Sequence, residues 1–386
     1  MKKKTDTTAI TGGRADGASL SPALWGSTVW ESRDLNDANT RAQGLRSEGF
    51  YSRYSNPTVT QFENAIAELE GAESALAFSS GMGAVASTVL ALCGHGSHIV
   101  AQNNMYGATL AFLQGPCARF GIETTYVDPT IKGSFAEAVV TGRTTLVLAE
   151  TPSNPLLTVT DLDEIGQIVG PFTVVDSTMA TPVGQQPLSH GVDLVLHSAT
   201  KGIGGHNDAL LGVIAGEKDL VDAVWSYAVM HGATPSPHDA LNALRGIRTM
   251  PIRVERQHTT LLRVADALIS HKRVTAVHHP FLSSHPQHRL AVEQMRYGGT
   301  VFSFEIDGDF ATCEKFVNAL QLAHIATSFG GPETLICHPA TSTHVGLSRQ
   351  DRERNGITDG LLRVSIGLEN PDDLVEDFSA ALNSLS

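Results

Sequence analysis

A chain of 386 residues with 41% hydrophobic residues is long enough for a large domain and a smaller one, each with a core of its own. The formal net charge is −13 and the acidic residues are spread along the sequence, which argues against binding to nucleic acid or to an anionic membrane. The 4 cysteines stand far apart without CxxC or Cys/His spacing, so neither a disulfide framework nor a metal site is supported.

Membrane and export signals are missing from the sequence pattern. The charged start of the chain is not followed by an apolar stretch of signal-peptide length, and no later run approaches the length of a membrane span. We therefore expect a cytoplasmic protein that acts on a small molecule, with no nucleic-acid partner, no membrane partner and no metal.

Residues 1 to about 50 are polar, with early glycines and few periodic apolar positions. This composition predicts an arm rather than a domain. The arm ends in two tyrosines and an arginine that crowd together before a proline turn, among them Tyr51 and Arg53. An arm of this kind needs a surface on which to lie.

After a first helix, strand-like and helical segments alternate between about residues 72 and 215. A capping-box pattern of Thr60 and Glu63 predicts that a helix starts near Thr58. The apolar runs that follow are separated by stretches long enough for helices, which indicates βαβ units and a mostly parallel sheet. Because ligands of such folds gather at the carboxyl ends of the strands, we expect the functional side chains there. The runs are Ser74–Phe78, His98–Ala101, Leu146–Ala149, Phe172–Val175, Leu194–Leu196 and Leu210–Ala215.

The pattern changes after about residue 246. Amphipathic helical stretches now alternate with strand-like ones, which predicts a smaller α+β domain. The expected helices cover about 256–271, 310–320 and 371–385, and the expected strands are Val301–Ile306 and Leu361–Leu368.

Lys201 follows one of the apolar runs and begins a turn rich in glycine. Ser198 and Thr200 stand beside it. A lysine at the mouth of a sheet, flanked by hydroxyl groups and flexible backbone, can form a Schiff base with an aldehyde cofactor whose phosphate the hydroxyls hold. Taken alone, this residue is better read as a surface lysine that caps a strand end, as most lysines are exposed, so the rest of the chain has to decide.

Three other side chains suit the same chemistry. Asp176 directly follows a strand, where a carboxylate can keep a pyridine nitrogen protonated; a helix N-cap is the alternative. Tyr106 follows another strand and can lay its ring on a flat cofactor, or simply pack. Arg363 lies inside an apolar strand, where its fork suits a substrate carboxylate or a buried ion pair.

Two turns complete the set. The small residues of Ser79–Ala84 open a helix and leave backbone N–H groups for a phosphate, although a strand-to-helix turn needs glycine in any case. In Glu150–Pro155, two prolines fix the loop and can hold Asn154 in a set direction, although turn chemistry alone explains the stretch nearly as well. Together these residues meet the requirements of pyridoxal phosphate chemistry one by one.

Six motifs occur in order along the chain. They are Tyr51–Pro57, Ser80–Ala84, Glu150–Pro155, Val175–Pro182, Ser198–His206 and Leu362–Glu369. They resemble the Cys/Met metabolism family of pyridoxal-phosphate enzymes, which includes cystathionine γ-synthase, cystathionine γ-lyase, methionine γ-lyase and the O-acylhomoserine sulfhydrylases. The resemblance implies the fold-type I, aspartate aminotransferase-like architecture, with a large domain on a mostly parallel seven-stranded sheet and a smaller α+β C-terminal domain.

The resemblance also implies roles for single residues. Lys201 is the expected Schiff-base residue and proton shuttle, Asp176 pairs with the ring nitrogen, and Tyr106 stacks on the ring. The expected phosphate ligands are the backbone N–H groups of Gly81 and Met82, the hydroxyls of Ser198 and Thr200, and Tyr51 and Arg53 from the neighbouring subunit. Asn154 is expected near the cofactor's hydroxyl, and Ser328 and Arg363 at the α-carboxylate of the substrate, with Tyr51 and Thr327 also at the substrate.

The implied assembly is a homotetramer made of two catalytic dimers. We expect residues 1–55 to form an arm that contacts the neighbouring subunit, residues 56–245 to bind pyridoxal 5'-phosphate, and residues 246–386 to form the C-terminal domain. The arm thereby gains a surface on which to lie, namely the other protomer.

The implied reaction is γ-elimination or γ-replacement on a sulfur-containing or O-activated homoserine-type amino acid, as in methionine γ-lyase or cystathionine γ-synthase. The chain departs from the family's usual residues at Ala108, Gly202, Met230 and Thr327, which are expected to influence specificity. Gly202, in place of an aromatic residue, suggests a wider pocket. A specialised substrate such as the sulfonium S-adenosylmethionine, a cystathionine or cysteine β-lyase activity, and a catalytically silent homologue are the alternatives.

Overall fold

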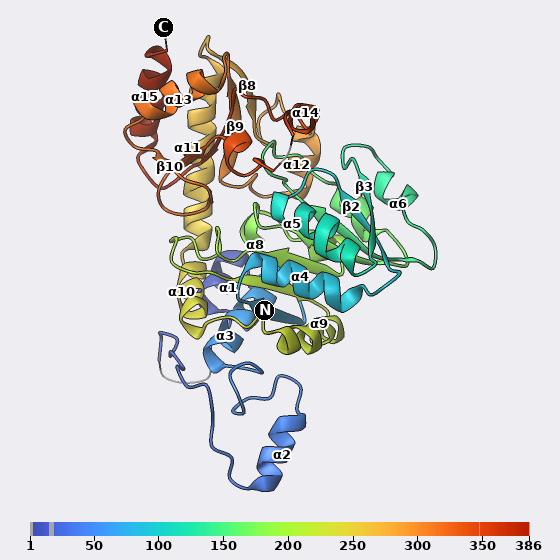
Figure 1. Ribbon diagram of the computed structural model, residues 1–386. Helices are drawn as coiled ribbons and strands as arrows, with labels where there is room; N and C mark the ends of the chain where they lie inside the picture. Colours follow the sequence, from blue (N-terminus) through green and yellow to red (C-terminus); the bar gives the residue numbers. More distant parts are fainter. Residues whose placement is uncertain (1–2, 15–18, 347, 386) are drawn as a thin grey trace.

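The computed structural model describes residues 3–14, 19–346 and 348–385. A seven-stranded sheet with the order β1-β7-β6-β5-β4-β2-β3 forms the centre of the large domain (Figure 1). Neighbouring strands run parallel except where β7 pairs with β1 and β6, so the expectation of a mostly parallel seven-stranded sheet is confirmed. The strands are β1 (Ser74–Phe78), β2 (His98–Gln102), β3 (Glu123–Val127), β4 (Thr144–Glu150), β5 (Phe172–Asp176), β6 (Leu194–His197) and β7 (Gly212–Gly216).

Helices cover both faces of this sheet because successive strand residues point to opposite sides. Leu194 and Leu196 pack with residues of α4 (Gly81–Leu92) and α9 (Lys218–His231). Val195 packs on the other side, with α3 (Pro57–Glu70) and α10 (Pro237–Ile247). The remaining helices around this sheet are α5 (Gly107–Phe112), the π-helix η1 (Leu113–Cys117), α6 (Ser134–Glu137), α7 (Leu162–Gly166), α8 (Thr181–Gly184) and the 3-10 helix η2 (Pro187–His190).

The smaller C-terminal domain is built on a five-stranded sheet with the order β10-β11-β12-β9-β8. A cluster of phenylalanines, including Phe304, Phe316 and Phe378, fills the space between this sheet and its helices. The strands are β8 (Val274–His278), β9 (Val301–Ile306), β10 (His324–Ile325), β11 (Leu335–Cys337) and β12 (Leu361–Ser365); the helices are α11 (Met250–Ile269), α12 (His288–Gln294), α13 (Phe310–Ala319), the 3-10 helix η3 (Pro339–Thr341), α14 (Arg349–Arg354) and α15 (Pro371–Asn383).

Helix α11 joins the two sheets, and Figure 1 shows it rising from the large domain into the smaller one. It begins at Met250, with Pro251 in its first turn, and not near residue 256 as the amphipathic pattern predicted. The early start has a simple reason, since proline is well tolerated in the first turn of a helix. None of the helices in the part of the chain that the structure describes is long and apolar enough to cross a membrane.

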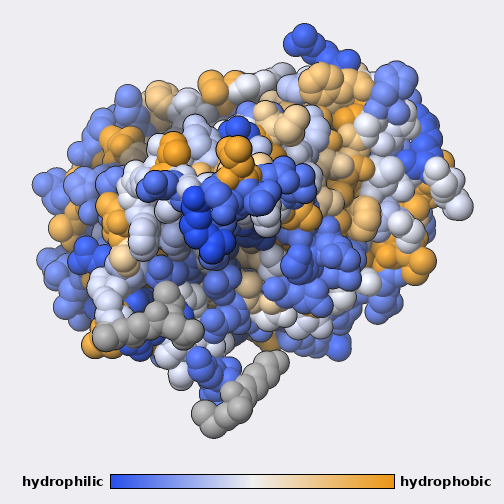
Figure 2. Space-filling model, turned by 90° about the horizontal axis from the view of Figure 1, so that it is seen from below, coloured by the Kyte–Doolittle hydropathy of each residue, from blue (hydrophilic) through white to orange (hydrophobic). Residues whose placement is uncertain are grey.

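The N-terminal segment contains two short helices. Helix α1 (Thr5–Thr11) packs against the large domain through Ala9. Helix α2 (Leu35–Gln43) lies in a loop that projects away from the body, and it contains no buried residue (Figure 1). Apolar side chains of this arm are exposed, with Leu35 at 89% and Leu20 at 72%. Figure 2 views the molecule from the side to which the arm projects and shows hydrophobic residues among hydrophilic ones at that surface.

The arm is joined to the body where α3 begins. The helix starts at Pro57 and is capped by Asn56, whose side chain accepts from the backbone N–H of Thr58 at 3.0 Å. The Asn56 amide also donates to the carbonyl of Trp25, at 2.9 Å. The helix start expected near Thr58 is therefore confirmed, but the cap is Asn56 and not the capping box of Thr60 and Glu63, because asparagine followed by proline is the stronger helix start.

His285 is a buried histidine near the smaller sheet, and it makes the free energy of unfolding depend on pH. Burial, and then the charge of His278, lower the pKa of His285 from 6.5 to about 4. His285 is thus neutral in the folded protein, whereas the unfolded chain takes up a proton near pH 6.5. The stabilising contribution is complete above that pH and is lost as the pH falls towards 4.

We expect the free energy of unfolding to fall by roughly 1 kcal/mol between pH 7 and pH 5 through this residue alone, after allowance for partial solvent access. Urea unfolding at the two pH values measures the loss, and His285→Gln should reduce it. The matched control is His238→Gln, since His238 is exposed. An equal loss in wild type and His285→Gln would contradict the prediction.

Candidate active site

A cavity of about 420 Å³ opens at the carboxyl ends of the parallel strands, where the large domain meets the C-terminal domain. It brings together most of the residues that the sequence singled out. Those that line it are Gly81, Met82, Tyr106, Asn154, Asp176, Ser198, Thr200, Lys201, Thr327, Ser328 and Arg363.

The first turn of α4 forms one end of the cavity. Ser80 caps the helix by accepting from the backbone N–H of Gly83 at 3.0 Å, so the N–H groups of Gly81 and Met82 come first in the helix. A Cβ atom on Gly81 would lie 2.7 Å from the Cβ of Ser198, which is too close for any side chain. Glycine at position 81 therefore lets the start of α4 lie directly against Ser198, and a helix N-terminus of this kind favours an anion.

Asp176 ends β5 and is held by Thr178. Both the backbone N–H and the hydroxyl of Thr178 donate to the same oxygen, Oδ1 of Asp176, with the N–H at 2.9 Å. The hydroxyl of Thr178 in turn accepts from the backbone N–H of Ser198, at 2.8 Å. Asp176 is thereby fixed relative to the lysine turn, and it does not act as a helix N-cap, because no helix begins directly after it. Burial raises its pKa, although the bonds from Thr178 oppose that effect.

Lys201 lies in the turn after β6, the neighbour of β5, and its Nζ donates to Oγ of Ser328 at 2.8 Å. Burial, and then the positive charge of Arg363, lower the pKa of this amine to about 8. The alternative of a solvated surface lysine is therefore wrong. Ser328 adopts φ +99°, a value that is uncommon for a residue with a side chain and that occurs often at functional sites.

Arg363 is buried, with 3% of its surface exposed. Its guanidinium donates to Oδ1 of Asn154 at 2.9 Å and to the carbonyl of Ser328 at 3.0 Å. No carboxylate among the described residues forms an ion pair with it, so the alternative of a structural ion pair is wrong. A buried guanidinium without a carboxylate partner, facing a cavity, is suited to bind a carboxylate from outside the chain.

Several further residues line the cavity that sequence reasoning did not single out, among them Glu150, Thr178 and Phe329. The ring of Phe329 lies 5.3 Å from Nζ of Lys201 and 5.9 Å from the guanidinium carbon of Arg363. Burial, and then the charge of Asp176, raise the pKa of Glu150 to about 8. Glu150 stood in a motif that was read only for its prolines and Asn154, and its position at a strand end was the signal that could have identified it.

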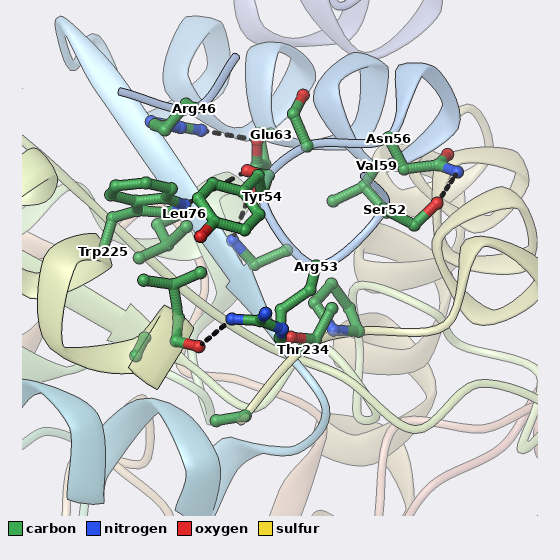
Figure 3. A pocket seen from close by; sticks show the side chains of 16 residues that line it. Arg46, Ser52, Arg53, Tyr54, Asn56, Val59, Glu63, Leu76, Trp225 and Thr234 are labelled. Atoms are coloured by element: carbon green, nitrogen blue, oxygen red, sulfur yellow. Dashed lines mark hydrogen bonds and ion pairs between the residues drawn. The ribbon is translucent and has the colours of Figure 1, made fainter. Parts of the chain in front are cut away.

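Tyr51 and Arg53 lie outside this cavity, at the root of the arm. Arg53 donates to the carbonyl of Val229 at 2.9 Å, and its guanidinium lies 5.1 Å from the ring centre of Tyr54. Figure 3 shows this region, in which Arg53, Tyr54 and Trp225 border a small cavity of about 40 Å³. Within one protomer these two residues do not meet the other site residues.

The four positions expected to influence specificity are placed differently from one another. Thr327 lines the cavity, whereas Ala108 and Gly202 do not, and Met230 is 83% exposed on α9. A Cβ atom on Gly202 would lie 2.7 Å from Cγ2 of Thr181, so the space beside this glycine is already filled. The glycine therefore does not widen the pocket, contrary to the expectation.

Metal-ligating side chains do not gather anywhere in the described part of the chain in a group that could hold an ion. All 4 cysteines are buried and free. The chemistry of the cavity is thus that of an amine, a guanidinium, two carboxyl groups and an anion site at a helix N-terminus.

Comparison with known proteins gives a consistent result. The model of the family described as Cys/Met metabolism PLP-dependent enzyme matches residues 6–383. Cystathionine gamma-synthase 1 of Nicotiana tabacum is 41% identical over 338 residues, covering 87% of this chain and 63% of that protein. The chain thus spans somewhat less than two thirds of the tobacco protein.

Two other similar proteins are matched over nearly their whole length. L-methionine gamma-lyase of Fusobacterium nucleatum subsp. polymorphum is 39% identical over 359 residues, which are 91% of each chain. The crystal structure of cystathionine gamma synthase from Xanthomonas oryzae pv. oryzae, in complex with aminoacrylate and cysteine, has a TM-score of 0.94 and 35% identity, covering 100% of this chain and 99% of the other.

The lowered pKa of Lys201 predicts an unusually reactive amine. With a pKa of about 8, its uncharged fraction at pH 7 exceeds that of an ordinary lysine by roughly two orders of magnitude. In protein from which any carbonyl cofactor has been removed, acetic anhydride should therefore modify Lys201 faster than it modifies other lysines of similar exposure. Residue-resolved mass spectrometry across pH measures the rate. If the modification rate of Lys201 rises with a midpoint near pH 10, as it does for exposed lysines, the prediction is contradicted.

Proposed function

The chain belongs to the family of Cys/Met metabolism PLP-dependent enzymes, and from this premise we propose that it catalyses γ-elimination or γ-replacement on a γ-substituted amino acid. The proposed substrates are sulfur-containing amino acids and O-activated homoserines. The observation that carries the proposal is the buried, carboxylate-free Arg363 in the same cavity as Lys201 and Asp176. Such a cavity suits an amino acid whose α-carboxylate is bound at one end.

The architecture is that of the fold-type I enzymes, as the fold match with cystathionine gamma synthase shows. The residues present fit pyridoxal 5'-phosphate. Gly81 lets the N-terminus of α4 lie close to Ser198, and we propose that the N–H groups of Gly81 and Met82, with the hydroxyls of Ser198 and Thr200, hold the phosphate. Asp176 keeps Oδ2 available for a ring nitrogen because its bonds with Thr178 use Oδ1.

The cofactor supplies an aldehyde that condenses with amines and a pyridine ring that withdraws electrons. We propose that Lys201, whose amine is half uncharged near pH 8, removes the α-proton of the substrate and then a β-proton. Tyr106 lines the same cavity, where its ring would stack on the cofactor, and Asn154 orients Arg363. Arg363 and Ser328 would hold the α-carboxylate, and Thr327 lines the cavity beside them.

Thr327 bears on the choice of substrate. A neutral side chain offers no counter-charge for a second ammonium group, so we propose that substrates with an uncharged γ-substituent, such as methionine or an O-acyl homoserine, are preferred over cystathionine. No specific contact favours a sulfonium substrate or β-elimination.

A screen of γ-substituted amino acids tests the proposed function. With methionine, cystathionine and O-acyl homoserines, we expect 2-oxobutanoate as the product without a thiol, and a thioether when a thiol is added. Lys201→Ala should abolish both products, since no other lysine among the described residues lines the cavity. Pyruvate would instead indicate β-elimination. The absence of any product and of any change in the visible spectrum would contradict the proposal.

The proposed assembly is a homotetramer of two catalytic dimers, in the cytoplasm. The arm supports this proposal. Helix α2 buries no residue within its own chain, and exposed apolar side chains such as Leu35 need a partner surface. Tyr51 and Arg53 lie at the root of this arm and outside their own cavity. We propose that they contact the phosphate and the substrate in the neighbouring subunit.

A subunit-mixing experiment tests this arrangement. Lys201→Ala and Arg53→Ala are each expected to be inactive alone. In a mixed dimer, one site would combine the intact Lys201 of one chain with the intact Arg53 of the other, so activity should return when the two variants are refolded together. Native mass spectrometry verifies that mixed oligomers have formed. Mixed oligomers without activity would contradict a shared site.

A further inference from the structure

Glu150 lines the cavity, and the proposed reaction gives it no part. It is the last residue of β4 and is 6% exposed. Its main chain is fixed by the buried Gln102, which donates to the Glu150 carbonyl at 2.9 Å and accepts from its N–H at 3.0 Å. The side chain is therefore held at the edge of the cavity by a rigid support and not by chance packing.

The two oxygens of Glu150 bind two different loops. Oε2 accepts from the backbone N–H of Tyr106 at 2.6 Å, and Oε1 accepts from the backbone N–H of Asn154 at 3.1 Å. Tyr106 follows β2 and Asn154 follows β4, so one carboxyl group fixes the relative positions of two turns.

The contact chain continues beyond Asn154. Oδ1 of Asn154 accepts from Nη1 of Arg363 at 2.9 Å, so the position of the Asn154 backbone also sets the direction of the guanidinium. The same guanidinium donates to the carbonyl of Ser328. The hydroxyl of Ser328 in turn accepts a hydrogen bond from the amine of Lys201. A shift of Asn154 would therefore change the angle between the carboxylate anchor and the amine that moves the protons.

We infer that Glu150 is a positioning residue, which aligns the ring of Tyr106 with the carboxylate anchor Arg363 and thereby fixes the orientation of the amino-acid substrate relative to Lys201. This inference rests on the proposed function, since it takes Arg363 as the anchor of the α-carboxylate. Glu150 itself touches neither the carboxylate nor the amine, and it acts through Tyr106 and Asn154.

Glu150→Gln tests the inference in the complete, cofactor-loaded enzyme. A side-chain amide has a single acceptor oxygen, so one of the two backbone N–H groups loses its partner. We expect KM for the amino acid to rise about tenfold, which corresponds to about 1.4 kcal/mol, with a smaller change in kcat. We also expect the visible circular dichroism of the bound cofactor to change, because the ring of Tyr106 moves relative to it.

Asp377→Asn is the matched control. Asp377 is 9% exposed and also accepts from two backbone N–H groups, those of Gln321 at 2.8 Å and Leu322 at 3.0 Å, but it lies in the C-terminal domain and does not line the cavity. Asp377→Asn should lower the melting temperature about as much as Glu150→Gln does, but it should leave KM and the dichroism spectrum unchanged. If Glu150→Gln behaves like this control, the inference is wrong.

Glu150→Asp serves as the second variant if the glutamine variant does not fold. It keeps both oxygens but is one carbon shorter, so it cannot reach Tyr106 and Asn154 at the same time, and the same rise in KM is expected. An unchanged KM in a folded Glu150→Asp overturns the inference. A wild-type enzyme with neither a cofactor band nor turnover would overturn the proposed function instead, and the two failures are thus distinguished.

Discussion

The hydrogen bond from Lys201 to Ser328 joins the two domains at the point where the chemistry is expected. Lys201 is carried by the turn after β6 in the large domain, whereas Ser328 and Arg363 belong to the smaller one. The low pKa of the lysine depends on this packing of the two domains, because its causes are burial and the positive charge of Arg363 from the smaller domain. A loosened domain interface would therefore restore an ordinary, protonated lysine.

The two acids of the cavity are brought together by the parallel sheet. Glu150 and Asp176 are register partners at the ends of β4 and β5, and adjacent strands lie about 4.8 Å apart. Burial raises the pKa of both acids, and the charge of Asp176 raises that of Glu150 further. Lys201 follows β6, the neighbour of β5 in the same sheet, whereas Arg363 comes from the smaller domain, so the cavity is completed only where the two domains meet.

Strand-end chemistry made much of this site predictable. Lys201, Asp176 and Tyr106 all line one cavity because each follows a strand of the same parallel sheet. Thr178 and Phe329 were not predicted, because they matter through contacts with residues distant in the sequence, which no local sequence pattern indicates. The edge strand β3 (Glu123–Val127) was missed for a related reason: it is partly exposed and has no apolar run. The role proposed for Tyr51 and Arg53 requires a second chain, which one sequence does not describe.

Thr181 and Gly202 have a further consequence for any attempt to alter this protein. Thr181 is buried with φ +63°, a conformation that a β-branched residue rarely adopts, and its methyl group occupies the place of a Cβ on Gly202. The two positions are therefore energetically coupled. A larger residue at position 202 is accommodated only after position 181 has been reduced, so the order in which the substitutions are made decides whether the intermediate variant folds.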